Sequence, residues 1–591
     1  MGTGAILAHA GSWSSDQWSY LAVPLAVYGG CVLALLKGGQ AEAASPARSF
    51  FRQISDSLER LTGFPGWSMA GALSGLTALL IGVIGLYWDV AWHIDYGRDQ
   101  QLFTPAHVMI LVGLGGLFYA GLVAATVATI DRAAVGFSLR GIRIPWSALT
   151  VAVMGAGAIA AFPLDNLWHQ AYGLDVTLWS PTHLQLLGGG ALATLAVWLM
   201  LAEARQGAQP TAVGRAIHVM AAGSALTGLT TFQGEFDFGV PQFQVVYLPV
   251  LIAVAAALTL VLARLALGPW GAVKAVGFYL ALRIFLALIV TGALNHTLPR
   301  FPLYLPSALA VEGAALLAGH TRRLRFALTA GALVGTVGLL GELTWVTLSG
   351  YGPPSPALLP KIAVLGPLAA IGAAVLGAGL ARAFSQGERR VPTASLALAS
   401  LALLASLAYP LPRNVGNVHA LISLDRTGDR AWVKVQLQPA DAARHATAFA
   451  VSSWQGGGRE TAMLREIAPG QYISAQPVPV TGRWKTMVAL SRGDEVMAAP
   501  VYMPADPEIG AAEIPAAPER RASFVRNTDL LLRETHGGPP LPAALAYTGW
   551  GISVALWIAL LAVTAIHAQP GSVGFAARSA GILGPKAAAS P

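Results

Sequence analysis

The chain has 591 residues, of which 55% are hydrophobic and only 11% are charged, and its mean hydropathy is +0.58. Soluble proteins carry roughly a quarter charged residues, so this composition excludes an ordinary soluble protein and indicates a polytopic membrane protein. The net charge of +8 is attributed to Lys and Arg kept on the cytoplasmic side, and no nucleic-acid partner is expected. The single cysteine, Cys31, excludes internal disulfides, Cys-based zinc sites and cysteine-ligated iron–sulfur clusters.

About thirteen apolar runs are long enough to cross a bilayer, which takes about 17–25 residues. They lie near 17–36, 68–88, 107–130, 147–164, 183–203, 213–231, 243–266, 274–293, 303–319, 325–345, 358–382, 393–410 and 545–567. The first twelve form an expected transmembrane helical domain over residues 1–410. The first run lacks the basic start and the small-residue cleavage site of a signal peptide, so we expect it to be retained as a span.

Basic residues alternate between the loops that join these runs. They follow spans one, three, five, seven, nine and eleven, as Lys37, Arg48, Arg52 and Arg60; Arg132, Arg140 and Arg143; Arg205 and Arg215; Arg264 and Lys274; Arg322, Arg323 and Arg325; and Arg389 and Arg390. Cytoplasmic loops carry such an excess of Lys and Arg. The pattern predicts a multi-pass protein of the inner (plasma) membrane, with its N-terminus and the other loops on the extracytoplasmic side.

Two of the expected outer loops carry the same polar motif. Asp89, Trp92, His93, Gly97, Asp99, Pro105 and His107 each recur 76 residues later, as Asp165, Trp168, His169, Gly173, Asp175, Pro181 and His183. The repeat is free of gaps, so it predicts two equivalent helical hairpins, at about 68–130 and 147–203.

The first copy shows what the motif can do. Asp89 and His93 are four residues apart, so they share one face of a helix. Thr104 is a favoured N-cap, Pro105 fits the first helical position, and His107 falls in the first turn. The positive end of the helix dipole disfavours imidazolium there, which leaves His107 neutral with a lone pair available. Two imidazoles and one carboxylate suit copper, iron or zinc better than calcium or magnesium.

A structural interpretation stays open beside this one. The Trp and Tyr residues around the motifs match the aromatic belt at a membrane interface, and a lone His among them is more often structural. Asp99 and Asp175 are either further ligands or caps of their loops. Two copies, each with a third ligand after the same 13-residue gap, favour metal binding at Asp89, His93 and His107 and at Asp165, His169 and His183.

Later outer loops hold weaker candidates. The loop from Asn295 to Pro299 is a weaker echo of the motif loops. Glu235, Asp237 and Glu342 are either cation- or proton-binding groups or solvated carboxylates at the membrane edge, and Glu312 lies deeper, where burial of a carboxylate is costlier.

Residues 411–505 have a different pattern, with strand-like alternation and glycine-rich turns, and predict an extracytoplasmic β-sandwich. Its histidines, His419 and His445, are either relay ligands or solvated surface groups. Residues 506–544 are expected to form a linker and an amphipathic segment, and residues 545–591 the final span and a cytoplasmic tail. The stretch Gly470–Trp484 loosely resembles small periplasmic β-sandwich domains found beside copper-handling membrane proteins.

The first motif closely resembles a copper motif that belongs to one membrane-embedded component of the particulate methane and ammonia monooxygenases. The resemblance lies in Trp92-His93, Arg98-Asp99 and Phe103-Thr104-Pro105-Ala106-His107. It implies that Asp89, His93 and His107 are copper ligands, with Asp165, His169 and His183 in the same roles in the second copy. Members of that family also use an Asn from a later helix near the metal, and by this resemblance Asn295 and His296 are possible additional ligands. The gap between the two histidines is one residue longer here than in that family, and the second copy has Leu174 and Trp179 where the family has Arg and Phe.

Two functions of different classes follow. The first is a membrane copper monooxygenase-like oxidoreductase that oxidises a small apolar substrate taken from the lipid, with an electron donor and other membrane subunits as possible partners. The second is a protein that captures, transports or delivers copper without catalysis, and a structural subunit of a larger complex is a third possibility. The ten methionines form no Met-x-x-Met ladder of the kind that would carry cuprous ion, which favours the first function.

Overall fold

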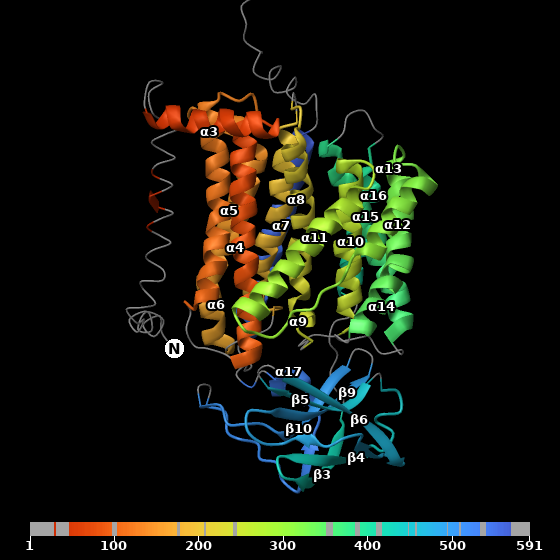
Figure 1. The fold of residues 1–591 in the computed structure, drawn as a ribbon. Coiled ribbons are helices and arrows are strands. Elements are labelled where there is room, and N and C mark those ends of the chain that lie inside the picture. The colour runs from red at the N-terminus through yellow and green to blue at the C-terminus, as the bar shows by residue number, and fades with distance from the viewer. Residues whose placement is uncertain are drawn as a thin grey trace, which may run out of the picture.

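The computed structural model divides the chain into a helical domain and a β domain that lies at one end of the helices (Figure 1). The described residues are 26, 29, 30, 33, 46–96, 103–173, 178–205, 208–239, 245–349, 358–384, 390–408, 417–446, 448–455, 458–492, 495–507, 510–531, 533 and 539–568.

The helical domain is built from long antiparallel helices and a few short ones. Its helices are α3 (Pro46–Thr62), α4 (Gly66–Tyr96), α5 (Pro105–Ile130), α6 (Trp146–Tyr172), α7 (Pro181–Glu203), α8 (Ala212–Thr230), α9 (Gly234–Asp237), α10 (Tyr247–Leu267), α11 (Gly271–Leu288), α12 (Leu305–Ala318), α13 (Arg323–Leu333), α14 (Leu339–Ser349), α15 (Leu359–Leu380), α16 (Thr393–Ala408) and α18 (Pro540–His567). A π-helical turn, η3 (Ile289–Ala293), continues α11, and a second one, η4 (Val334–Gly338), joins α13 to α14. A small hairpin of β1 (Phe137–Leu139) and β2 (Ile142–Ile144) connects α5 to α6.

Among the described residues, nine helical segments are long and apolar enough to cross a membrane. Helices α8, α12 and α16 occupy three further predicted spans, but α12 and α16 are shorter, with 14 and 16 residues. The predicted span at 17–36 lies outside the described residues apart from four positions. The chain is therefore a multi-pass helical protein with a separate β domain, and the number of thirteen spans stays a prediction.

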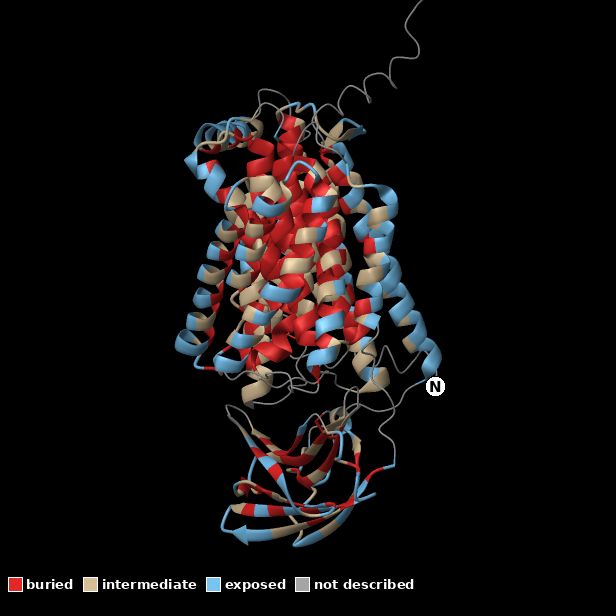
Figure 2. Ribbon diagram, turned by 90° about the vertical axis from the view of Figure 1, so that its right-hand side faces the viewer, coloured by how far each residue is buried: buried red, intermediate tan, exposed pale blue. Residues whose placement is uncertain are grey.

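The centre of the helical domain is buried and the outward faces of its peripheral helices are exposed (Figure 2), and many of the exposed side chains are large and apolar. Leu316, Leu348 and Leu288 are 88%, 78% and 66% exposed, whereas buried Ala and Leu side chains fill the centre. Such an outer surface is stable in lipid and would aggregate in water.

The two motif hairpins, α4–α5 and α6–α7, pack through small residues. A Cβ placed on Gly113 of α5 would lie 2.5 Å from Gly82 Cα of α4, so only glycine permits this approach. In the second hairpin a Cβ on Gly189 would lie 2.7 Å from Ala158 Cβ. These pairs are 76 residues apart, like the motifs. Small residues at helix contacts let the backbones come close within a membrane.

Helices α4 and α6 continue beyond the expected span ends at residues 88 and 164, to Tyr96 and Tyr172. The added turns contain neither Gly nor Pro, and Gly173, with φ of 84°, ends α6. Asp89 and His93 of α4, and Asp165 and His169 of α6, therefore stand on the last turns of helices and not on loops.

The last helix, α18, returns to the second hairpin. Trp557 is 1% exposed and packs over Gly157, Gly188 and Gly189 of α6 and α7. The hydroxyls of Thr150 and Thr564 lie 2.8 Å apart. This packing supports α6 and α7 from the side.

Helix α3 lies across the end of the bundle opposite to the β domain (Figure 1). It carries Arg48, Arg52 and Arg60, and exposes Phe50 and Leu61 by 58% and 55%. A helix with basic and apolar residues in this position is typical of one that lies in the membrane interface.

The β domain is one continuous sheet that curls around its own core. Its strands are β3 (His419–Thr427), β4 (Arg430–Gln438), β5 (Ala448–Gln455), β6 (Gly458–Ala468), β7 (Gln471–Ser474), β8 (Val478–Pro479), β9 (Lys485–Arg492), β10 (Glu495–Tyr502), β11 (Glu519–Ser523) and β12 (Val525–Arg526). They pair in the order β11-β3-β4-β7-β6-β5-β9-β10-β12, with β8 beside β4. Strand β6 pairs with β5 along its first half and with β7 along its second, so it joins the two faces.

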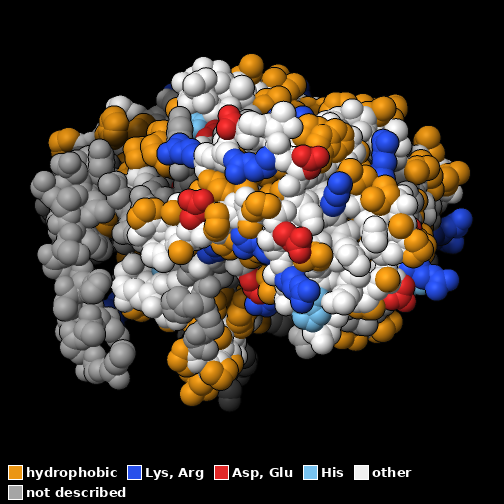
Figure 3. Space-filling model, turned by 90° about the horizontal axis from the view of Figure 1, so that it is seen from below, with side chains coloured by type: hydrophobic (Ala, Val, Ile, Leu, Met, Phe, Trp, Pro, Cys, Tyr) orange, Lys and Arg blue, Asp and Glu red, His pale blue; other side chains and the backbone are white. Residues whose placement is uncertain are grey.

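The sequence predicted a β-sandwich, and the observed sheet is closer to a partly open barrel. Strands β11 and β12 follow each other in the chain yet lie at opposite ends of the pairing order, so the two edges of the sheet come together at Phe524. Both strands lie in the region 506–544, which was expected to form a linker and an amphipathic segment, and the short helix α17 (Asn527–Leu531) lies in the same region. The outer face of this domain mixes Lys and Arg with Asp and Glu (Figure 3), as water-exposed surfaces do.

Buried carboxylates in the helical domain accept hydrogen bonds from the starts of helices. Glu203 accepts from the backbone N–H groups of Trp146 and Ser147 at the start of α6. Glu312 accepts from Ala272 N–H at the start of α11 and forms an ion pair with Arg264 at 2.8 Å. The first N–H groups of a helix lack intrahelical partners, which explains why a carboxylate is stable there.

One fully buried ion pair joins α9, α11 and α4. Arg283 of α11 contacts Asp237 at 2.7 Å, and both side chains are 1% exposed. Tyr87 of α4 donates to the same carboxylate oxygen at 2.7 Å and lies under the guanidinium at 4.3 Å from ring centroid to Cζ. Asp237, a candidate cation-binding group from the sequence, is therefore engaged in holding these three helices together.

We predict that Asp237→Asn destabilises the protein by about 3–5 kcal/mol, because Arg283 then keeps a buried and uncompensated charge. Adding Arg283→Met should recover much of the loss. Thermal unfolding in detergent micelles measures both changes. The exposed Arg526–Asp529 pair provides the control, and Asp529→Asn should cost less than about 1 kcal/mol. Equal midpoints for the two Asp variants would contradict a structural role for the buried pair.

Candidate metal centres

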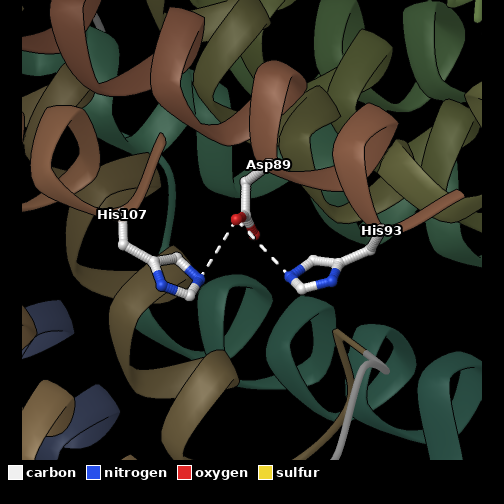
Figure 4. Close-up of side chains that lie close together, drawn as sticks. All are labelled: Asp89, His93 and His107. Carbon is white, nitrogen blue, oxygen red and sulfur yellow. Dashed lines mark ion pairs between the residues drawn. The ribbon is translucent and has the colours of Figure 1, made fainter. Parts of the chain in front are cut away.

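The first cluster consists of Asp89, His93 and His107, and all three side chains point toward one spot between α4 and α5 (Figure 4). Asp89 Oδ1 lies 3.1 Å from His107 Nε2 and 3.5 Å from His93 Nε2. The two imidazole ring centroids are 6.1 Å apart. The side chains are only 16–22% exposed, so the cluster is a partly buried polar site in an apolar setting.

The second cluster consists of Asp165, His169 and His183, and it repeats this geometry between α6 and α7. Asp165 Oδ2 lies 3.4 Å from His183 Nε2 and 3.6 Å from His169 Nε2, and the ring centroids are 6.0 Å apart. The carboxylate is more buried than its counterpart, at 8% exposure against 16%.

These distances fit ligands gathered around a metal ion. Two atoms bound to a metal at about 2.1 Å lie about 3.4 Å apart at a tetrahedral angle and about 3.0 Å apart at a right angle. In each cluster the ligand atoms lie within 4.8 Å of one another, so a small movement of one side chain completes the arrangement. Three protein ligands leave positions open for water or dioxygen. Without a metal the same side chains form carboxylate–imidazole contacts.

Local sequence fixes the position of the third ligand in each cluster. Thr104 Oγ1 accepts from His107 N–H at 3.2 Å, and Ser180 Oγ accepts from His183 N–H at 3.3 Å. Pro105 and Pro181 occupy the first helical positions. The predicted capping of both helices is confirmed, and it holds each histidine in the first turn, opposite the Asp of the preceding helix.

The two clusters differ at one residue beside the carboxylate. Thr182 Oγ1 donates to Asp165 Oδ1 at 2.5 Å. The equivalent position in the first hairpin is Ala106, which has no hydroxyl. A hydrogen bond to one carboxylate oxygen orients the other toward the histidines, so Asp165 is held more firmly than Asp89.

Both clusters line one cavity of about 580 Å³. The walls are mostly apolar side chains of α4, α5, α7, α8 and α11. Phe162 of α6 lies between the hairpins, with its ring centroid 6.1 Å from that of His107 and its Cα one turn before Asp165. Trp454, Lys485 and Leu531 of the β domain also line the cavity, so this domain covers the end at which the clusters lie.

The other proposed ligands do not join either cluster within the described residues. Asp99 and Asp175 lie outside the described part of the chain. Asn295 is exposed, with φ of 57°. His296 is 7% exposed, and its Nδ1 lies 2.8 Å from Asp95 Oδ2, an oxygen that also accepts from Thr297 N–H at 2.8 Å.

Asp95 is a residue whose role could not be predicted from the motif. It stands on α4 six residues after Asp89 and fixes the loop that follows η3 to the motif helix. The position equivalent to it in the second copy is Ala171, so the repeat gave no signal for it.

The remaining carboxylate and histidine candidates have structural or surface positions. Glu235 lines the cavity and accepts from Leu178 N–H at 2.8 Å, which holds the end of the second motif loop. Glu342 is fully buried and accepts from Leu303 N–H at 3.0 Å. His419 is exposed and contacts Ser523 Oγ at 2.9 Å, and His445 is exposed.

No protein-family model, curated protein or solved structure matches the chain. The assignment of function therefore depends on the geometry of the two clusters and of the cavity that they share.

We predict that each cluster binds one metal ion. His93→Ala with His107→Ala should remove about half of the bound metal, and adding His169→Ala with His183→Ala should remove the rest, because each cluster then lacks both imidazoles. Metal analysis of purified protein measures the content. The exposed pair His419→Ala with His445→Ala should leave it unchanged. Full metal content in the fourfold variant would refute both sites, and loss of all metal with the first pair alone would indicate one shared centre.

We also predict that Thr182→Ala weakens metal binding in the second cluster by about 10–100-fold and leaves the first cluster unchanged. Chelator competition measures each affinity separately when the histidines of the other cluster are Ala. Thr194→Ala is the matched control, since Thr194 lines the same cavity on α7 but bonds only to Ala191 C=O. Ala106→Thr should make the metal affinity of the first cluster more similar to that of the second cluster. An unchanged affinity after Thr182→Ala would contradict the orienting role.

Proposed function

We propose that the protein is a metal-dependent oxidoreductase, with copper as the metal, that oxidises an apolar molecule taken from the lipid. The observation that carries the proposal is the position of two Asp-His-His clusters at the polar end of one apolar cavity. Ligand pockets combine apolar walls with a few convergent polar groups in this way. A protein that only captured or passed on copper would have no need of an apolar cavity of this size.

The ligand set supports copper over the other candidate metals. Two imidazoles and one carboxylate suit copper, iron and zinc, and copper binds most tightly of these to nitrogen-rich sites. Zinc supports no redox chemistry, which leaves copper or iron for an oxidation. The resemblance of the first motif to a copper motif of membrane monooxygenases points to copper.

The proposed reaction inserts one atom of dioxygen into a C–H bond. The C–H bond breaks and a C–O–H group forms, the second oxygen atom leaves as water, and a reductant of the hydroquinone class supplies two electrons and two protons. Bound copper would supply the binding and reduction of dioxygen. The reductant and any partner subunits would meet the chain at the covered end of the cavity.

The residues of the chain have separate roles in this proposal. Asp89 and Asp165 hold their two imidazoles at a fixed separation and balance the positive charge of the metal. The capped helix starts hold His107 and His183 in the first turns of α5 and α7, with Nε2 of each facing its carboxylate. Apolar walls exclude water and accept the hydrocarbon part of the substrate. The β domain shields the end of the cavity at which the clusters lie from bulk solvent.

We place the clusters and the β domain on the extracytoplasmic side of the inner membrane. The basic loops support this orientation, because Arg140 and Arg143 of the β1–β2 hairpin and Arg48, Arg52 and Arg60 of α3 lie at the opposite end of the helices. Lys and Arg are retained on the cytoplasmic side. Copper and dioxygen would then reach the clusters from the extracytoplasmic face.

We predict that copper-loaded protein given a hydroquinone, labelled dioxygen and a series of alkanes forms an alcohol that carries the oxygen label. Mass spectrometry detects the product. The fourfold His→Ala variant should fall to the background of metal-free protein, because no imidazole remains to hold the metal, whereas His419→Ala with His445→Ala should keep the parent's rate. Label-free alcohol, or labelled alcohol at the parent's rate from the fourfold variant, would contradict the proposed function.

A further inference from the structure

The cavity is long and has two chemically different ends. Along α4 its lining runs from Ile94 back to Leu76, a rise of about 27 Å at about 1.5 Å per residue. The hydrocarbon core of a bilayer is about 30 Å thick, so the cavity extends through much of the membrane depth. Both clusters lie at one end, and the other end is bordered by Leu117, Met220 and Ser224.

The middle of the cavity opens sideways, between α4 and α11. Leu80 and Phe285 both line the cavity, and they are 36% and 43% exposed. Helix α11 runs obliquely across the bundle and packs on α8 (Figure 1), and it contacts α4 at Arg283, which lies over Tyr87, and through its continuation η3. The space between α4 and α11 therefore faces the hydrocarbon core of the membrane.

The shape of the cavity selects among apolar molecules. A volume of about 580 Å³ extended over this length leaves a narrow channel, which fits one flexible chain better than a compact ring system. Two threonine hydroxyls in the deep part are already bonded within their own helices, since Thr194 donates to Ala191 C=O and Thr227 to Gly223 C=O. The deep part therefore offers contacts to hydrocarbon and few to polar groups.

From these observations we infer that the occupant is a molecule with a single long hydrocarbon chain, which enters from the membrane between α4 and α11. Its chain lies along α4 toward Leu76, and the carbon to be oxidised lies beside the two clusters. This inference rests on the proposed function for the oxidation step, which follows the stoichiometry given above, with dioxygen and a hydroquinone-type reductant. Binding of this hydrocarbon molecule to the protein requires neither metal nor turnover.

Gly190 of α7 is the position at which the deep part can be shortened. It lines the cavity, and a Cβ added there would meet only Leu114 Cδ2, at 3.5 Å, which is an ordinary contact. A Phe side chain at this position would fill the channel about two turns of α7 beyond His183. Gly277 of α11 is the matched control, because it is exposed and a Cβ added there has nothing within 4 Å.

The test is equilibrium binding of radiolabelled octane and hexadecane to metal-free protein in detergent micelles. Gly190→Phe should weaken hexadecane binding by about tenfold or more, as expected when two or three methylenes lose their burial, and should change octane binding much less. Gly190→Leu should give an intermediate loss, and Gly277→Phe should change neither affinity. Full metal binding by both Gly190 variants, measured separately, verifies that they fold.

Three results would overturn the inference. They are failure of the parent protein to bind hexadecane, equal loss of octane and hexadecane in Gly190→Phe, and an equal effect of Gly277→Phe. These outcomes are distinct from failure of the proposed function, because binding is measured without metal. If Gly190→Phe weakens hexadecane binding selectively but the protein oxidises nothing, the inferred binding site stands and only the proposed oxidation is refuted.

Discussion

The close approach of the two helices in each motif hairpin is the constraint on which the site depends. Glycine and alanine at the contact between α4 and α5, and again between α6 and α7, let the backbones meet, so that an Asp on one helix reaches a His in the first turn of the next. Larger residues there would separate the helices by more than the few tenths of an ångström that the cluster tolerates. Capping by Thr104 and Ser180 then fixes the last ligand in place.

Much of this arrangement was readable from the sequence because it is local and repeated. Spacing of four residues, a Thr-Pro or Ser-Pro helix start and a repeat distance of 76 residues were enough to predict both clusters and both caps. The shared cavity was not predictable, since it depends on how α8 and α11 pack against the hairpins. Asp95 was missed because its partner, His296, lies 201 residues away and the second copy lacks it.

Most of the buried charged groups described above hold helices together. The two Asp-His-His clusters differ from them because they line the cavity. Glu203 and Glu312 accept from helix starts, and Asp237 pairs with Arg283. The partners of these carboxylates could not be predicted from the sequence, because hydrogen bonds across a helical bundle depend on tertiary packing. The β domain adds a cover of Trp454, Lys485 and Leu531 at the polar end of the cavity. Strands β11 and β12, which complete its sheet, were not predicted, because they are short and directly follow a Pro- and Ala-rich stretch typical of linkers.

Both clusters are proposed to be metal centres facing one cavity, and the proposed oxidation depends on that claim. Its most direct test is an anomalous difference map recorded at the copper absorption edge from crystals of the copper-loaded protein. Two peaks are expected, each about 2.0–2.2 Å from the Nε2 atoms of its two histidines and beside its Asp carboxylate. Copper-loaded protein that shows no peak at either cluster, with the metal held instead by the β-domain histidines His419 or His445, would contradict it.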